Sequence, residues 1–306
     1  MRALTTTNDG TVEFAEVPEP TCTSSELLVR VTASTISRGD LHAARLSPPG
    51  TPMGLDVAGV VVEAAADGSG PSVGTRVMGY AARAGGWAEK AAVDSSLLVP
   101  VPKALSDDLA AALPNSGLAA LAGLEASGFL LGSRVLVTGA TGGVGRLAVQ
   151  LAHLSGAEVT GLVSSPERRE QLAGFDWLTA VTADEAQGPF DLIVDLVGGE
   201  VLSRALSWVA EGGVVASLAQ TASETASVPL FWFAMHKGAR LVSVYNSEGQ
   251  REAGRGVRRL GLLGRLAETK RIDPQITRTT SWEEAPGLLA ALGRRELEGR
   301  TVVRVS

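Results

Sequence analysis

The feature that most constrains this chain is a glycine-rich segment between an apolar run and an amphipathic helix. The segment reads Thr138-Gly-Ala-Thr-Gly-Gly-Val-Gly145. The apolar residues before it, 135–137, predict a strand buried on both faces of a parallel sheet. Apolar residues after it recur at helical spacing, at 144, 147, 151 and 154. This order predicts a strand, a tight turn and a helix, the arrangement that holds the pyrophosphate of a dinucleotide.

Glycines suit such a turn because a side chain would keep the backbone away from a phosphate group. Gly139, Gly142, Gly143 and Gly145 lie where the strand period changes to the helical one. The helix N-terminus that follows would present free N–H groups and the positive end of its dipole. A tight turn without a ligand is the alternative. No Gly-Lys-Ser/Thr ending follows, which argues against a P-loop nucleotide triphosphatase.

The end of the next strand bears on which cofactor is used. An NAD site has an acid about 20 residues beyond the glycines, which binds the ribose hydroxyls. Here that place holds Ser164 and Ser165, followed by Arg168 and Arg169. Hydroxyl and guanidinium groups suit a 2′-phosphate, which an acid would repel. The sequence therefore favours NADPH over NADH, with a solvated arginine face as the alternative.

Composition excludes several classes of protein. A length of 306 residues suggests two domains, and 45% hydrophobic with 20% charged residues is ordinary for a soluble globular protein. No apolar run reaches membrane-spanning length and the N-terminus lacks a secretory apolar core, so the expected location is cytoplasmic. A formal charge of −6 disfavours nucleic acid or an anionic membrane as the main partner. The single cysteine, Cys22, permits no internal disulfide.

The chain changes its periodicity along its length. Up to about residue 100, short β-branched runs separated by Gly, Pro and Ser clusters predict a β-rich domain. Ser106 is an expected helix N-cap. From about 118 to 246 strands and helices alternate, which predicts a doubly wound parallel sheet. The expected fold class is α/β, with domain boundaries at 1–116, 117–264 and 265–306.

The chain resembles the medium-chain dehydrogenase/reductase superfamily over nearly its whole length. The segments that carry the resemblance are, in order, Gly54-Leu-Asp-Val-Ala-Gly-Val-Val, Gly74-Thr-Arg-Val, Gly85-Gly-Trp-Ala-Glu, Leu113-Pro with Gly117-Leu-Ala-Ala-Leu, the glycine turn, and Gly299-Arg-Thr-Val-Val. The resemblance implies a GroES-like substrate domain (1–116 and the return 265–306) and a Rossmann NADPH-binding domain. It also implies a homodimer, joined through an edge strand of the nucleotide-domain sheet, for which 240–245 is the candidate.

Zinc alcohol dehydrogenases of this superfamily carry an early Cys ligand and a later Gly-His-Glu segment. Here Gly54-Leu55-Asp56 stands at the second place, and no cysteine follows Cys22. Ligand count thus argues against both a catalytic and a four-cysteine structural zinc. Within the superfamily the chain is similar to the zinc-independent quinone oxidoreductases, which use NADPH to reduce quinones or activated C=C bonds.

The resemblance also assigns cofactor contacts residue by residue. It assigns the 2′-phosphate to Ser164, Ser165 and Arg168. The ends of later strands, at Val197 and Leu218, are expected to flank the two halves of the cofactor, because open α/β sheets bind ligands at strand carboxyl ends. The pyrophosphate is assigned to the strand end and the turn, namely Thr138, Gly139, Ala140, Thr141, Gly142, Gly143, Val144 and Gly145.

Conjugate reduction without a metal needs a hydrogen-bond donor at the carbonyl oxygen, and finally a proton. Related reductases have an Asn-x-x-Asp/Glu element beside the nicotinamide, which here reads Ser37-x-x-Asp40. The tyrosine that some relatives use as proton donor has no counterpart. His42 and Tyr80 are the remaining candidates, with a structural role for either, or water as the proton source, as alternatives. The aromatic run 231–233 either roofs a planar substrate or packs in the core.

The sequence thus predicts an NADPH-dependent, zinc-independent reductase of a quinone or an α,β-unsaturated carbonyl. A ketone reductase or a cyclisation-assisting enzyme with the same cofactor is the second hypothesis. The third is a sensor that binds NADPH without turning it over.

Overall fold

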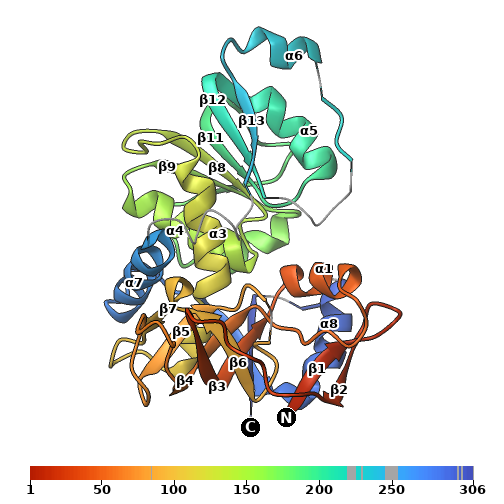
Figure 1. Cartoon of the computed structure of the whole chain (residues 1–306). Coiled ribbons are helices and arrows are strands. Elements are labelled where there is room, and N and C mark those ends of the chain that lie inside the picture. The colour runs from red at the N-terminus through yellow and green to blue at the C-terminus, as the bar shows by residue number, and fades with distance from the viewer. Residues whose placement is uncertain are drawn as a thin grey trace. The chain divides into compact units, whose positions relative to one another are not determined.

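Two sheets of different kinds organise the chain (Figure 1). The computed structural model describes residues 1–83, 85–218, 225–228, 230–244, 254–294, 296–297 and 299–305. The chain divides into two compact units. Unit 1 comprises Met1–Leu118 and Ser247–Ser306, and unit 2 comprises Ala119–Asn246.

Unit 1 is β-rich, as predicted. A small antiparallel pair joins β1 (Arg2–Thr6) to β2 (Val12–Glu16). The main sheet has the order β14-β15-β3-β4-β5-β7, and β6 pairs with β3 off this path. Its strands are β3 (Glu26–Ile36), β4 (Asp56–Glu63), β5 (Arg76–Tyr80), β6 (Lys90–Asp94), β7 (Leu98–Pro100), β14 (Ile276–Ser281) and β15 (Arg300–Arg304).

The core of this sheet comes from apolar residues of neighbouring strands, including Val29, Val57 and Val77, all fully buried. Gly59 lets β3 and β4 approach each other, since a Cβ there would lie 2.1 Å from the carbonyl oxygen of Arg30. The register between these strands shifts nearby. The β-rich half therefore depends on a glycine within a strand as well as on its apolar alternation.

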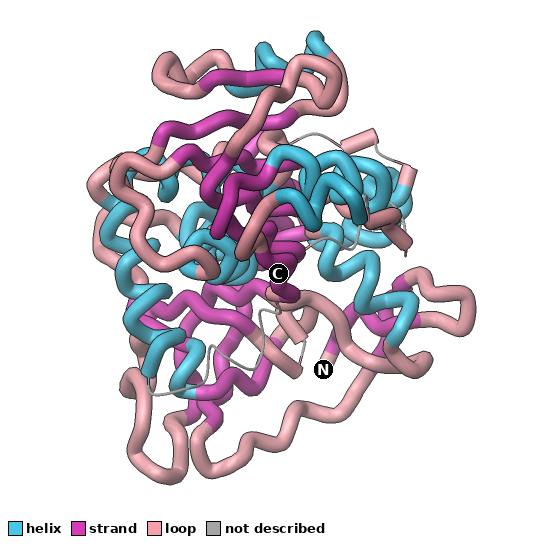
Figure 2. The backbone as a smooth tube through the Cα atoms, turned by 90° about the horizontal axis from the view of Figure 1, so that it is seen from above, coloured by secondary structure: helices cyan, strands magenta, loops and turns pink. Residues whose placement is uncertain are grey.

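Helices accompany the strands throughout the described chain (Figure 2), and some of them belong to unit 1. The predicted N-cap at Ser106 is confirmed, because its side chain accepts a hydrogen bond from the N–H of Leu109 at 3.2 Å. The helices are α1 (Arg38–Leu46), α2 (Asp107–Ala111), α7 (Arg255–Glu268) and α8 (Ala285–Gly293), with 3-10 turns at Ser95–Leu97 and Trp282–Glu284. α3 (Pro114–Glu125) continues from unit 1 into unit 2.

Unit 2 is the predicted doubly wound domain, with six parallel strands in the order β10-β9-β8-β11-β12-β13. α4 packs on β8 and β9, and α5 packs on β11 and β12. The strands are β8 (Arg134–Thr138), β9 (Glu158–Leu162), β10 (Thr179–Val181), β11 (Phe190–Asp195), β12 (Val209–Ser217) and β13 (Arg240–Ser243). The helices are α4 (Gly143–Leu154), α5 (Gly199–Trp208), α6 (Leu230–Met235) and the 3-10 helix η2 (Pro166–Leu172).

The structure differs from the sequence expectation at the C-terminal boundary. We expected the return at 265, whereas unit 1 takes in the chain from Ser247. α7 packs within unit 1, where a Cβ on Gly264 would lie 3.3 Å from Pro102 Cγ. Apolar periodicity predicts the helix but does not specify which sheet it covers.

The structure also bears on the expectations for the aromatic run 231–233 and for the edge strand 240–245. Core packing was the alternative for 231–233, but Phe231 is 73% exposed, so that interpretation is wrong for this residue. Phe233 does pack against the core of unit 2. The expected edge strand 240–245 is observed as β13, and Tyr245 lies outside the described residues. Within the described ranges, no helix combines the length and apolar character needed to cross a membrane.

Candidate functional site

The predicted cofactor residues of unit 2 follow the carboxyl ends of four adjacent strands. β9, β8, β11 and β12 are neighbours in the parallel sheet. Gly139 follows β8 and Ser164 lies just beyond β9. Val197 and Leu218 follow β11 and β12. The chain runs from β8 to β9 on one side and continues on the other side of β8 with β11, so the turn lies at a topological switch point, where such sheets bind ligands.

The glycine turn has the geometry of a phosphate cradle. Gly139 has a φ of 62°, a conformation that favours glycine. A Cβ on Gly145 would lie 2.3 Å from the carbonyl oxygen of Gly139, so only glycine lets α4 begin this close to the end of β8. Gly142 is the N-cap of α4. Because glycine has no side chain, the first N–H groups of the helix receive no side-chain cap. The turn therefore fits the pyrophosphate of a dinucleotide.

Thr138 lies beneath the turn and has a positioning role. Its buried hydroxyl donates to Asp195 Oδ1 at 2.8 Å and accepts from the N–H of Leu196 at 2.9 Å. The N–H groups of Val197 and Gly198 also donate to the Asp195 carboxylate. Burial raises the pKa of Asp195, and the Thr138 hydroxyl is the strongest group that opposes this rise. These bonds join the end of β8 to the loop after β11.

Arg146 is a residue that the sequence analysis missed. It lies in the first turn of α4 and is only 5% exposed. Its Nε donates to the carbonyl oxygen of Thr141 at 2.9 Å, and its Nη1 donates to that of Gln171 at 2.8 Å. Arg146 thus joins the glycine turn to η2, which carries Arg168 and directly follows Ser164 and Ser165. A charged residue four positions before Gln150, inside an otherwise apolar helix, was the available sequence signal.

The structure shows an acidic partner for one of the two adjacent arginines of η2. Arg169 forms an ion pair with Glu185. The N–H of Thr182 and then Arg169 lower the pKa of Glu185 to about 2. Ser164 is exposed and Arg168 is half-buried. Glu167 directly precedes Arg168 in the chain, and a hydrogen bond from Ser165 lowers the pKa of this acid.

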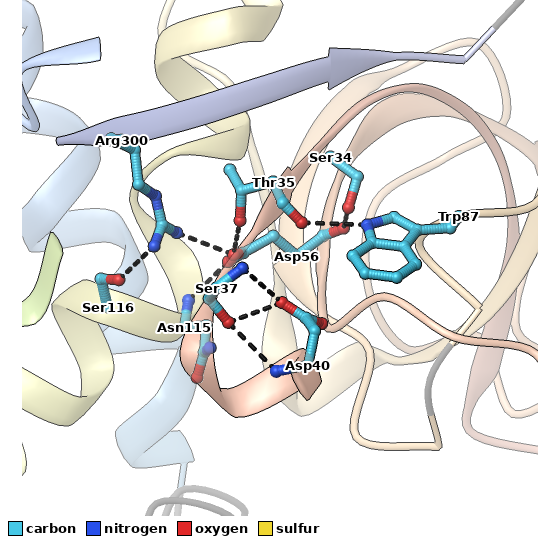
Figure 3. A network of polar contacts seen from close by, with 9 residues as sticks. All are labelled: Ser34, Thr35, Ser37, Asp40, Asp56, Trp87, Asn115, Ser116 and Arg300. Carbon is cyan, nitrogen blue, oxygen red and sulfur yellow. Dashed lines mark hydrogen bonds and ion pairs between the residues drawn. The ribbon is translucent and has the colours of Figure 1, made fainter. Parts of the chain in front are cut away.

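In unit 1, the predicted Ser37-x-x-Asp40 element is the capping box of α1 (Figure 3). The Ser37 hydroxyl donates to Asp40 Oδ2 at 2.5 Å, and the N–H of Ser37 donates to the same oxygen at 2.8 Å. The N–H of Asp40 donates in return to the Ser37 hydroxyl at 3.3 Å. Ser37 is half-buried, whereas Asp40 is 1% exposed. The element therefore fixes the start of α1. The Asp40 carboxyl is buried and takes part as a hydrogen-bond partner of Ser37.

The Asp40 carboxyl lies in surroundings that disfavour its charge. Burial raises the pKa of Asp40 to about 7, against the lowering effect of the Ser37 hydrogen bonds, and the negative charge of Asp56 raises it further. Among the described residues, Asp40 Oδ1 has no hydrogen-bond partner. A carboxyl that holds its proton near neutral pH fits this site.

Beside it lies a buried ion pair that the sequence analysis also missed. Arg300 Nη2 donates to Asp56 Oδ2 at 2.8 Å, and both side chains are almost fully buried (Figure 3). The N–H of Asn115 donates to Asp56 Oδ1 at 2.7 Å, and the Thr35 hydroxyl donates to Oδ2. Arg300 Nη1 donates to the Ser116 hydroxyl at 2.6 Å. Burial raises the pKa of Asp56, and Arg300 is the strongest of the groups that oppose this rise.

These contacts do not fit a catalytic zinc at the place of the Gly-His-Glu segment. Both oxygens of Asp56 already accept hydrogen bonds, and Leu55 offers no ligand. Cys22 is partly buried, and burial raises the pKa of its thiol. Over the residues that the structure describes, no group of three or more His, Cys, Asp and Glu side chains is arranged to hold a metal ion.

The other two catalytic candidates lie in the same unit. His42 is half-buried on α1, two residues after Asp40. Tyr80 ends β5, is 7% exposed and pairs in register with Asp56. His42 thus lies on the helix that the capping box orients, and Tyr80 lies on the strand beside the ion pair.

Replacing Asp40 tests the buried carboxyl. Since its folded pKa is raised, the folded protein binds the proton more tightly than the unfolded chain, and the wild type loses stability as pH rises from about 4 to about 7. Asp40→Asn lacks this titration. We expect the stability of Asp40→Asn relative to the wild type to grow by roughly 1.4 kcal/mol per pH unit over that window. Chemical denaturation of both proteins measures it, and a difference independent of pH would contradict the assignment.

Replacing Arg146 tests its positioning role. Arg146→Met removes both hydrogen bonds while keeping most of the volume, so the glycine turn and η2 lose their link. We expect nicotinamide nucleotide binding, measured by calorimetry, to weaken by about tenfold. Gln150→Leu is the matched control, because Gln150 lies one turn later on α4 and its Nε2 donates to the carbonyl oxygen of Arg146. Equal losses in both variants would show a general effect on α4 instead.

Comparison with known proteins agrees with this geometry. Residues 23–103 match the family model of the alcohol dehydrogenase GroES-like domain, and residues 143–255 match that of the zinc-binding dehydrogenases. The first match lies within unit 1, and the second begins at Gly143 of the glycine turn and continues through the rest of unit 2.

Individual relatives match over most of this chain. It is 34% identical over 243 residues to 2-methylene-furan-3-one reductase of Solanum lycopersicum, covering 71% of this chain and 62% of that protein. The chain thus spans about three fifths of that relative. It is 32% identical over 272 residues to acrylyl-CoA reductase AcuI of Ruegeria pomeroyi, covering 83% of this chain and 80% of that protein.

The fold is shared with solved structures. Mycobacterial Rv1454c, solved in complex with NADPH, superposes with a TM-score of 0.85 at 22% identity, covering 99% of this chain and 100% of that one. The chain therefore belongs to the medium-chain dehydrogenase/reductase superfamily of NAD(P)-dependent oxidoreductases, with a GroES-like domain in unit 1 and a Rossmann domain in unit 2.

Proposed function

We propose that this protein is an NADPH-dependent, zinc-independent reductase of an α,β-unsaturated carbonyl or a quinone. The observation that carries the proposal is the turn at Gly139–Gly145, which lies at a switch point with Ser164 and Arg168 on the adjacent loop. The two relatives described above are named for the reduction of conjugated C=C bonds, which supports an enone as the substrate class.

Residues of both units have roles in this proposal. The N-terminus of α4 and the glycine turn would hold the pyrophosphate, and Arg146 keeps the turn in place. Ser164 and Arg168 would bind the 2′-phosphate. Bound NADPH would supply the hydride that adds to the β-carbon of the substrate.

The protein must then stabilise the developing enolate and supply a proton. The half-buried Ser37 hydroxyl belongs to the capping box at the start of α1, which orients His42 on the same helix. Tyr80 is the second side chain with an exchangeable proton, and Asp56 and Arg300 hold charge beside its strand. We assign proton donation to His42 and Tyr80, and positioning to Ser37 and Asp40.

The reaction is tested with purified protein, NADPH and a panel of enones, quinones and ketones, followed by nicotinamide absorbance. We expect oxidation of NADPH with enones or quinones and none with ketones. His42→Asn and Tyr80→Phe separate the donors: the variant that loses kcat at unchanged NADPH affinity identifies the group that delivers the proton. Oxidation with ketones alone favours the ketone reductase, and tight NADPH binding without any oxidation favours the sensor.

The two arginines after β9 provide a matched test of the cofactor. Arg168→Gln removes the guanidinium assigned to the 2′-phosphate, whereas Arg169→Gln removes one that is already paired with Glu185. We expect Arg168→Gln to weaken NADPH binding by about tenfold or more and NADH binding little, since a charge-assisted hydrogen bond is lost only with NADPH. Arg169→Gln should change neither. Equal weakening of both nucleotides by Arg168→Gln would refute the phosphate pocket.

We also propose a homodimer joined through β13, which lies at one edge of the unit 2 sheet. The strand is exposed, and Leu241 on it is 44% exposed. An unpaired sheet edge is a surface on which a second copy adds its own edge strand. Leu241→Pro removes a backbone donor from the outer side of this edge, because residues 242 and 244 are the ones that direct their N–H groups toward β12. We therefore expect the molar mass measured by light scattering to fall from that of a dimer to that of a monomer. A wild-type monomer at micromolar concentration would contradict the proposal.

A further inference from the structure

Unit 1 contains an open groove between the end of β7 and α7, and none of its lining residues is assigned a role above. Its volume is about 640 Å³. One wall is the segment that leaves β7 and the other is one face of α7. The walls are apolar and the rim is basic, with the lining formed by Val99, Pro100, Val101, Pro102, Lys103, Val257, Arg258, Gly261 and Arg265.

The basic side chains of this groove are not neutralised. Lys103, Arg258 and Arg265 are exposed, and none has an ion-pair or hydrogen-bond partner among the residues that the structure describes. Several arginines elsewhere in unit 1 do have acidic partners, as Arg76 has in Asp107. Three unpaired cations around one groove contrast with the formal charge of −6 of the whole chain. Such a groove attracts a ligand with several negative charges.

Gly261 keeps the groove open. Glycine inside a helix costs about 1 kcal/mol relative to alanine. One turn later, Gly264 is required by packing, since a Cβ there would lie 2.9 Å from Met78 Cε and 3.3 Å from Pro102 Cγ. At Gly261 a Cβ would meet only Arg265 Nη1, at 3.4 Å. Packing therefore does not explain this glycine, whereas an occupant of the groove does.

We propose that the groove binds the phosphorylated end of an enoyl coenzyme A, so that the substrate of the proposed reductase is a thioester. Guanidinium and ammonium groups suit its phosphates, and the apolar walls suit the arm that follows them. Within unit 1, β5 joins the groove to a proposed donor. Val77 pairs with Pro100 of the wall. Tyr80 ends the same strand three residues later, roughly 10 Å along it. The inference rests on the proposed function for the chemistry at the enoyl group.

Two substrates with the same reacting group test the groove. Crotonyl coenzyme A carries the phosphates, and the crotonyl thioester of N-acetylcysteamine lacks them. In the double variant Arg258→Gln/Arg265→Gln, we expect KM for crotonyl coenzyme A to rise about tenfold or more at unchanged kcat. KM for the short thioester should not change. Arg30→Gln, at an exposed arginine of β3 outside the groove, is the control and should affect neither substrate.

A second variant fills the groove and leaves its charges. Gly261→Leu places an apolar side chain on the α7 wall of the groove. We therefore expect KM to rise by a similar factor for crotonyl coenzyme A and to stay unchanged for the short thioester. Its melting temperature should not fall, because leucine favours the helix more than glycine does. This result separates a blocked groove from a misfolded helix.

Calorimetry with free coenzyme A and the wild-type protein, without nicotinamide nucleotide, gives a readout that is independent of turnover. No binding of free coenzyme A, together with equal KM values for the two thioesters, would overturn the groove assignment while leaving the reductase in place. Binding that the double variant loses, without reduction of either thioester, would support the groove and refute the proposed reaction.

Discussion

The close approach of α4 to the end of β8 is the contact on which the nucleotide-binding half depends. Gly145 contacts the carbonyl oxygen of Gly139 at a distance that no side chain permits. That contact directs the first N–H groups of α4 toward the space above the turn. The hydroxyl of Thr138 and the guanidinium of Arg146 then hold the neighbouring loops through buried hydrogen bonds. One steric constraint thus shapes the turn that we propose as the phosphate site.

The GroES-like half is organised around buried charge instead. Asp56 and Arg300 lie 244 positions apart in the chain and meet in the core, where residues of β3 and α3 hydrogen-bond to them. Removing either partner would leave an unpaired buried charge, which is strongly unfavourable. Asp40 lies close enough to feel both charges. The protonation of the α1 capping box is therefore linked to the pair that joins the two ends of this unit.

Local patterns predicted the parts of the structure that local physics determines. The change of period around the glycines predicted β8, the turn and α4, and the alternation of elements predicted the parallel sheet. The N-cap at Ser106 was predictable because the preference of serine for that position is local. Long-range contacts were not predictable in this way. Nothing near Arg300 in sequence indicates Asp56 as its partner, and the amphipathic pattern of α7 does not indicate the sheet on which it packs.

The same distinction applies to the site. Ser37 and Asp40 were selected because they resemble the Asn-x-x-Asp/Glu element of related reductases. The same spacing defines the capping box that the structure shows, in which Asp40 is buried. Sequence alone could not show that Arg169 is paired, because its partner Glu185 lies 16 residues away. A side chain's availability depends on its partners, and these come from the tertiary fold.

The manner in which Arg146 holds η2 has a consequence for how cofactor preference can diverge. The guanidinium bonds to the main-chain carbonyl of Gln171, which every amino acid possesses. Side chains on the loop proposed to bind the 2′-phosphate can therefore be exchanged in the course of evolution while its anchor persists. Selection for a different nicotinamide nucleotide would act on a few exposed positions, and the proposed pyrophosphate cradle would be inherited unchanged.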